Sequence, residues 1–132
     1  MLLHTITALH PDQALARGLP LTFEMSRFIK FVLTEIFPGG RLPSVDKVEF
    51  HATANGFTID RVQGLRPHYA KTLDAWATRL CRHRAKAIAL QSEAVYLRYM
   101  KYLTGCAQLF RDGYTDVHQF TFRKTGQCAA RG

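Results

Sequence analysis

The chain has 132 residues, of which 47% are apolar and 21% charged, with a formal net charge of +8. This length fits one domain, and this balance excludes an intrinsically disordered chain. No apolar run is long enough to span a membrane, and the first residues lack the basic region and cleavage site of a signal peptide. Cys81, Cys106 and Cys128 are far apart without a metal-binding pattern, which predicts free thiols in the cytoplasm.

The positive charge suits several kinds of partner. Nucleic acid, anionic lipid and an acidic carrier protein all attract a basic surface, and a positive balance also keeps a protein in solution. The sequence contains no helix-turn-helix, zinc-finger or RNA-recognition signature, so nucleic acid is not predicted.

The first elements are a strand and an unusually apolar helix. Residues 1–7 predict a strand with apolar residues on both faces, which is typical of the inside of a sheet. Residues 8–20 predict a loop with a helical turn at 12–17, after which Thr22 can cap the next helix. In that helix the residues at helical spacing are Met25, Phe28, Ile29, Val32, Leu33 and Ile36, with Phe23, Phe31 and Phe37 adding apolar surface beside them.

A helix with this much apolar surface needs cover on more than one side, or an apolar ligand. Pro38 ends it, because proline disfavours the helical conformation of the residue before it. Gly39 and Gly40 then allow a tight turn.

The next part of the chain predicts a short helix, a strand and a long helix. Ser44 can cap a helix that Asn55-Gly56 ends, and residues 57–62 predict a strand. Pro67 suits the first turn of a helix that continues to about residue 90. The apolar residues near one face of this helix are Tyr69, Leu73, Trp76, Leu80 and Ile88.

The last part predicts a helix, a strand and a tail. Ser92 can cap a helix that closes at Gly113, residues 117–124 predict a strand, and residues 125–132 predict a disordered tail. The apolar stripe of the helix consists of Val95, Tyr96, Tyr99, Met100, Leu103, Cys106 and Phe110. The resulting order β-α-α-β-α-α-β predicts an α/β protein.

Several runs of this sequence resemble the C-terminal half of the mycolic acid cyclopropane synthases, within the S-adenosylmethionine-dependent cyclopropane-fatty-acyl-phospholipid synthase family. The resemblance covers residues 1–124, in order and with matching gaps. The runs are Met1–Ile6 (MLLHTI), Arg27–Phe31 (RFIKF), Thr34–Ser44 (TEIFPGGRLPS), Asn55–Thr58 (NGFT), Arg66–Leu73 (RPHYAKTL), Arg98–Cys106 (RYMKYLTGC) and Tyr114–Val117 (YTDV).

The resemblance implies the C-terminal portion of a Rossmann-like methyltransferase sheet with helical lipid-binding insertions. The chain would supply the fifth, sixth and seventh strands, with the seventh between the other two. In this family the glycine-rich turn for S-adenosylmethionine belongs to the first half of the protein. Gly39-Gly40 is not such a turn, because it follows a predicted helix and not a strand.

The family's reaction adds a methyl group to a cis double bond of a long lipid acyl chain, and a bound bicarbonate looks to be the base that then removes a proton. His4 and Tyr69 match the histidine and tyrosine that hold this anion. Judged on the residues alone, His4 also fits a strand histidine bonded to backbone. Tyr69 equally fits a core tyrosine at the start of a helix, where backbone N–H groups favour an anion.

Cys106 matches a cysteine treated as an active-site residue of the family. No histidine lies at helical spacing from it, so we expect a neutral thiol that lines the channel more readily than it reacts. The residues that match the acyl channel also fit plain core packing; they are Phe37, Leu42, Leu73, Tyr102 and Phe110.

The helix predicted from Pro67 to about residue 90 also carries a basic group on its other face. It suits an acidic acyl-carrier protein or anionic headgroups at the inner membrane face, or it is a solvated helix face. Its members are Arg79, Arg82, His83, Arg84 and Lys86.

The prediction is therefore a C-terminal fragment of a cyclopropane mycolic acid synthase, inactive by itself and in need of an N-terminal half. The alternative is a small basic lipid- or membrane-binding protein without catalysis.

Overall fold

The computed structural model describes residues 1–126 of the chain. Its strands are β1 (Leu2–Ala8), β2 (Phe57–Gly64) and β3 (Thr115–Lys124). Its helices are α1 (Pro11–Ala16), α2 (Phe23–Phe31), α3 (Val45–Ala54), α4 (Arg66–Arg82), α5 (Arg84–Leu90) and α6 (Glu93–Asp112), with a π-helical segment η1 (Val32–Ile36) directly after α2.

The three strands form one sheet in the order β1-β3-β2, with β3 antiparallel to both neighbours. The last strand of the chain therefore lies between the first two, as the resemblance predicts. Within the described residues β1 is an edge strand, and Leu2 is 62% exposed. The interior position predicted for this strand from its apolar residues is not found, because β1 pairs on one side only.

The two faces of the sheet carry different side chains. Ile6 of β1 is paired with Val117 of β3, and both pack against the helical core. Phe120 and Phe122 are buried on the opposite face, where Phe57 packs edge-on against Phe122. The side chains of β3 therefore alternate between the two faces of the sheet.

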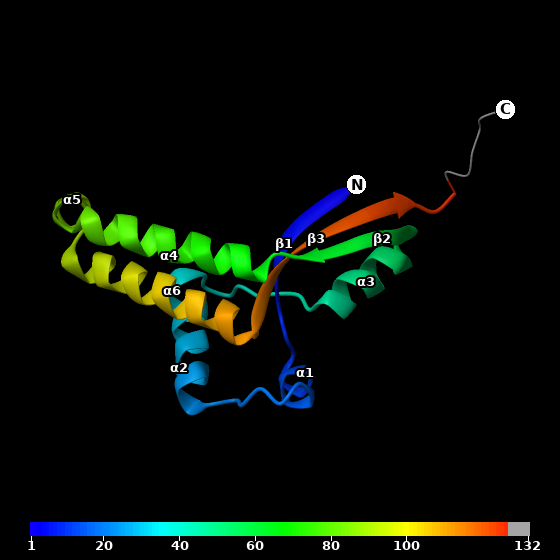
Figure 1. Cartoon of the computed structure of the whole chain (residues 1–132), viewed down its shortest axis with the longest axis horizontal. Helices are drawn as coiled ribbons and strands as arrows, with labels where there is room; N and C mark the ends of the chain where they lie inside the picture. Colours follow the sequence, from blue (N-terminus) through cyan, green and yellow to red (C-terminus); the bar gives the residue numbers. More distant parts are fainter. Residues whose placement is uncertain (127–132) are drawn as a thin grey trace.

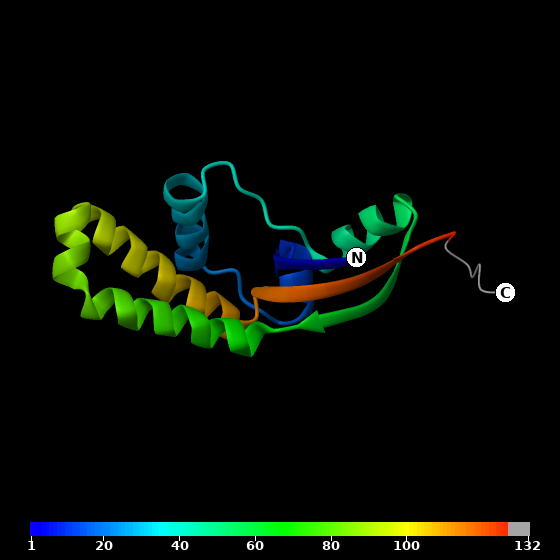
Figure 2. The ribbon, with the colours of Figure 1, turned by 90° about the horizontal axis from the view of Figure 1, so that it is seen from above.

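A long hairpin of α4 and α6 projects from one end of the sheet, and α5 lies at its far end (Figures 1 and 2). The two long helices pack through buried side chains, several of them small: Ala70, Leu73, Ala77, Leu103, Ala107 and Phe110. A single helix from 67 to 90 was predicted. The helix instead ends at Arg82 and a new one begins at Arg84, because His83 has φ −104° and ψ 25°.

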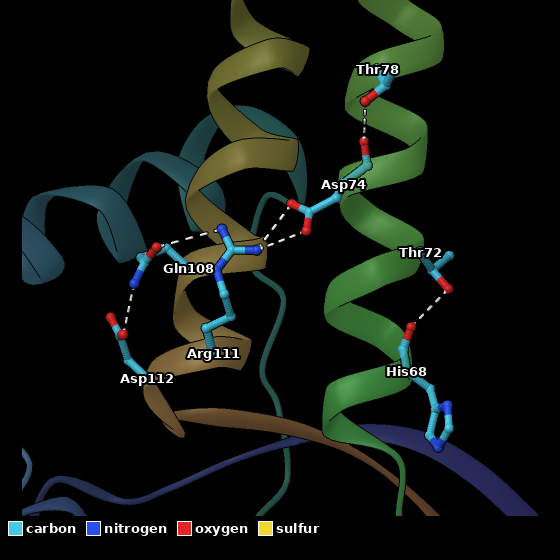
Figure 3. A network of polar contacts seen from close by, with 7 residues as sticks. All are labelled: His68, Thr72, Asp74, Thr78, Gln108, Arg111 and Asp112. Atoms are coloured by element: carbon cyan, nitrogen blue, oxygen red, sulfur yellow. Dashed lines mark hydrogen bonds and ion pairs between the residues drawn. The ribbon is translucent and has the colours of Figure 1, made fainter.

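One exposed ion pair joins the two helices near the sheet. Arg111 of α6 donates from Nη1 to both carboxylate oxygens of Asp74 of α4, at 3.0 and 2.9 Å, and Gln108 bonds to Asp112 nearby (Figure 3). Because both charged side chains are about half exposed, we assign this pair at most about 1 kcal/mol. Burial of the apolar side chains holds the hairpin together.

Helix α2 crosses α6 at a glycine (Figure 1). The Phe28 ring lies directly over Gly105, where a Cβ would overlap the ring. The contact continues with Lys101 Nζ 4.2 Å from the centroid of the Phe31 ring and with Glu35 paired to Arg98 at 3.1 Å. Gly105 thus permits the close approach of α2.

The apolar helix does not continue regularly to Phe37, as was predicted. The Phe37 amide donates to the carbonyl of Val32, five residues earlier, which is π-helical bonding. The Thr34 hydroxyl bonds back to the Lys30 carbonyl at 2.9 Å, which favours bending of this turn. Gly39, with φ +73°, then turns the chain.

The predicted helix caps are confirmed with one exception. The side chains of Thr22 and Ser92 accept from the amides of Met25 and Val95. Ser44 precedes α3 as predicted, but its buried hydroxyl has no hydrogen-bond partner among residues 1–126.

Three further predictions require correction. Strand β2 extends to Gly64, and β3 begins at Thr115. Trp76 and Tyr99 were expected on buried faces, but they are 44% and 47% exposed because alanines occupy the hairpin contact. Thr125 donates its amide to the carbonyl of Gly56, and residues 127–132 of the predicted tail lie outside the described residues.

We predict that Gly105→Ala destabilises the protein by about 1 kcal/mol or more, because the overlap with Phe28 exceeds the gain in helix propensity. In the Phe28→Ala background the same substitution should stabilise the protein by about 0.5–1 kcal/mol, since the overlap is gone. Urea unfolding followed by circular dichroism measures both changes. Stabilisation in the parent chain would contradict the predicted overlap.

Candidate functional site

The base of the hairpin brings most of the predicted site residues together. Tyr69 and Leu73 come from the first turns of α4, and Tyr102, Cys106 and Phe110 come from one side of α6. All five belong to, or pack against, the same apolar cluster. The ring centroids of Tyr69 and Phe110 are 5.0 Å apart.

Burial determines the protonation of this cluster. It raises the pKa of the Cys106 thiol to about 12, so the thiol is neutral at pH 7 and a poor nucleophile. Burial, with a smaller effect of Cys106, also raises the pKa of Tyr69 and brings that of Tyr102 to about 12. Both phenols therefore remain hydrogen-bond donors. A neutral Cys106 agrees with the interpretation of this residue as channel wall.

His4 lies on the sheet and not in the cluster. It is exposed on β1, opposite Gln119 of β3. Because side chains alternate along a strand, His4 is on the same face as Ile6, which packs against the cluster containing Tyr69. His4 and Tyr69 therefore share one side of the sheet, with His4 about 7 Å along the strand from Ile6.

The two remaining channel candidates lie after α2. Phe37 packs edge-on against Tyr102, with 5.7 Å between ring centroids, and its other side is open, since it is 54% exposed. Leu42 is 49% exposed on the loop before α3. The structure thus links Phe37 to the cluster, while a channel role of Leu42 stays a prediction.

The described residues do not fit S-adenosylmethionine. A glycine-rich turn between a strand and a helix would be needed. Strand β1 instead leads through Leu9 and His10 into α1, and Gly39-Gly40 follows η1.

A polar pocket of about 370 Å³, which no sequence pattern indicated, lies beside the end of β1, the start of β3 and the start of α4. Thr7 and His118 line it and are joined by a hydrogen bond of 2.8 Å; Asp116 lies 3.7 Å from His118, and Arg17 and Arg66 line the pocket too. It contains none of the predicted site residues. Its members come from separate segments with no shared spacing, so no sequence pattern could have located it.

The described residues contain neither a membrane span nor a metal-binding cluster. Residues 1–126 include no helix with the length and apolar character of a membrane span. In the same residues, no cluster of three or more histidine, cysteine or acidic side chains is arranged to hold a metal ion.

Comparison with solved structures defines the class of protein first. The chain matches the cyclopropane synthase MmaA2 of Mycobacterium tuberculosis with a TM-score of 0.91 and 59% identity, over 93% of this chain and 43% of that one. A second match is mycolic acid cyclopropane synthase CmaA1 complexed with SAH and CTAB, with a TM-score of 0.89 and 64% identity, over 94% of this chain and 44% of that one. The fold is that of the C-terminal part of such methyltransferases.

Sequence comparison then identifies the family. The family model for mycolic acid cyclopropane synthetase matches residues 1–120, and the chain belongs to this family. Cyclopropane mycolic acid synthase 1 of Mycobacterium tuberculosis is 64% identical over 124 residues. That alignment covers 94% of this chain but 43% of the relative, so the chain spans less than half the length of the proteins it matches.

We predict that Cys106 resists alkylation in the folded protein. Iodoacetamide at pH 8 should modify exposed Cys81 at least about tenfold faster than Cys106, because Cys106 is half-buried and its thiol is neutral. Mass spectrometry of the two peptides measures the rates. In urea the two rates should become similar, which is the control for reagent access. Equal rates in the folded state would contradict the assignment of a buried, protonated thiol.

Proposed function

We propose that this chain is the acyl-binding portion of an S-adenosylmethionine-dependent cyclopropane mycolic acid synthase, which transfers a methylene or methyl group to a cis double bond of a long lipid acyl chain. The main supporting observation is the cluster at the hairpin base, on the side of the sheet that carries His4. Its members are Tyr69, Leu73, Tyr102, Cys106 and Phe110. Two residues of α4 and three residues of α6 thus form one apolar surface with hydroxyl donors. This surface suits an acyl chain with an anion beside it.

The proposed chemistry needs a dry surface and a base. Held by residues outside this chain, S-adenosylmethionine would supply a methyl group to one carbon of the double bond and leave as S-adenosylhomocysteine, with a cation on the other carbon. Loss of a proton to the base then permits ring closure. Apolar side chains of the hairpin exclude water, which would otherwise capture the cation. The faces of Tyr69 and Phe110 stabilise positive charge near the double bond.

Bicarbonate is the proposed base. The Tyr69 hydroxyl keeps its proton because burial raises its pKa, and the phenol makes no hydrogen bond within residues 1–126. It is thus free to donate to an anion at the start of α4, where the first-turn amides also favour negative charge. His4 would donate from the sheet. Cys106 would line the site and take no part in proton transfer.

The function requires a second polypeptide segment. The cofactor cradle would come from an N-terminal half, which we propose as the principal partner. Exposed apolar residues support such a partner: Phe23 is 78% exposed, and Leu2 on the face of β1 that carries His4 is also exposed. We place the protein in the cytoplasm, acting on lipid acyl chains presented by a carrier protein or a membrane surface.

A non-catalytic role as a small lipid-binding protein is the second candidate. The absence of a cofactor cradle from the described residues favours it, together with the exposed apolar face of α2. Complementation with an N-terminal half separates the two functions.

We predict that the chain alone shows no S-adenosylmethionine binding by calorimetry. Co-expression with the N-terminal portion of cyclopropane mycolic acid synthase 1 should restore cofactor binding and transfer of labelled methyl groups to a lipid with a cis double bond. The N-terminal portion by itself is the control. Tight cofactor binding by the chain alone, or an associated pair that transfers no label, would show that the proposal is wrong.

In the complemented enzyme, Tyr69→Phe and His4→Gln should each lower kcat by roughly tenfold to a hundredfold, because each removes one donor to the anion. Tyr99→Phe is the matched control, since it removes the hydroxyl of a half-exposed tyrosine of the same hairpin and keeps the ring that contacts Tyr102. Added bicarbonate should partly rescue the two site variants. If Tyr69→Phe and Tyr99→Phe behave alike, Tyr69 has no role at the anion.

A further inference from the structure

The far end of the hairpin carries a concentrated positive charge. Between Ala75 and Ser92 the chain has four Lys or Arg residues and no Asp or Glu. Among the described residues, Arg84 pairs with Glu93 at 2.8 Å, whereas no acidic side chain lies within ion-pair distance of Arg79, Arg82 or Lys86. At the other end of the same hairpin, Arg111 is neutralised by Asp74 (Figure 3). Three of the four cations at the tip therefore have no ion-pair partner within the described residues.

Apolar side chains are exposed among these cations. Helix α5 turns Ala87 and Ile88 inward, while Lys86 and Leu90, one turn apart on the same side, are exposed. Leu90 is 70% exposed, which is high for a leucine at the end of a helix. The two alanines between and beside them, Ala85 and Ala89, are exposed as well. The outer face of α5 thus presents a basic side chain beside alanine and leucine side chains.

We propose that α5 and its flanking residues form a docking surface for an anionic phospholipid membrane, which we call the tip surface and define as Arg79, Arg82, His83, Arg84, Lys86 and Leu90. Lys and Arg attract anionic headgroups, and an exposed leucine among them enters the boundary between headgroups and acyl chains. The helix break at His83 turns α5 across the end of the hairpin, so its outer face is presented to whatever the tip meets (Figures 1 and 2).

A membrane fits this surface better than an acidic protein does. A specific protein interface needs roughly 800 Å² of buried surface on each partner and complementary shapes. The tip is a helix of seven residues on which an aliphatic side chain, that of Leu90, is 70% exposed. A lipid surface requires no complementary shape, and it binds basic side chains through its headgroups and an aliphatic side chain through its acyl chains. A protein partner remains the outcome that the experiment below distinguishes.

If the proposed function holds, a membrane contact at the tip would deliver lipid to the cluster at the base of the hairpin. Along α6, Tyr99 and Tyr102 lie between the tip and Cys106, and their rings are in edge contact. A lipid leaving a membrane at the tip would follow this aromatic side of α6 toward Tyr69. The membrane contact itself does not depend on catalysis.

Vesicle flotation of the intact chain tests the proposal. Vesicles of phosphatidylcholine with about one third phosphatidylglycerol, at about 0.1 M salt, should bind the chain, and pure phosphatidylcholine vesicles should bind it far less. Arg82→Glu with Lys86→Glu should weaken binding by roughly twenty-five-fold or more, at about fivefold per removed charge. The matched control, Lys47→Glu with Lys124→Glu, makes the same change in net charge away from the tip and should retain most of the binding.

A second pair of variants tests insertion of the leucine. Leu90→Ser should weaken vesicle binding about tenfold, whereas Phe50→Ser, at a residue of similar exposure on α3, should have no effect. Circular dichroism verifies that each variant is folded. Equal losses for the tip and control charge reversals would overturn the proposal, because binding would then reflect net charge alone. It would also be overturned if the tip variant kept vesicle binding but lost binding to an acidic acyl-carrier protein. Neither result depends on cofactor or on methyl transfer.

Discussion

The close packing of α4 against α6 is the contact on which the rest of the structure depends. Alanines lie where the two helices meet, and Ala107 has no exposed surface. Small side chains let the helices approach, so the larger residues beside them point toward one common side. Tyr69 and Phe110 meet there, each about two helical turns from where Ala77 and Leu103 hold the hairpin closed. The site is thus a consequence of helix packing at alanine positions.

The two ends of the hairpin differ in burial and charge. At the base, burial keeps Cys106 and Tyr102 protonated and surrounds them with apolar side chains. At the tip, cations and a leucine face solvent. The sheet anchors the base through Ile6 and Val117, and α2 crosses the middle at Gly105. A rigid pair of helices therefore connects a proposed reaction site to a proposed membrane contact.

Helix α2 shows how its local sequence pattern and its tertiary contacts together determine which of its apolar side chains are covered. Its apolar circumference indicated a need for cover on more than one side, and one side is covered by α6 through Phe28 and Phe31. The other side retains exposed Phe23, Ile29 and Leu33. In relatives more than twice as long as this chain, further residues are available to cover such a surface.

The sequence by itself determined the number and order of the strands, the positions of most helix caps and the family. These depend on local signals: side-chain hydroxyls at Thr22 and Ser92, glycines at positive φ such as Gly113, and long matching runs of residues. The membership of the cluster at the hairpin base could be predicted only through the resemblance, since Leu73 or Phe110 alone also fits any core. Tertiary structure alone decided the break at His83, the exposure of Trp76 and Tyr99, and the pocket beside His118. Each of these depends on which distant side chains come into contact, and a periodic apolar pattern does not specify whether alanine or an aromatic residue occupies that contact.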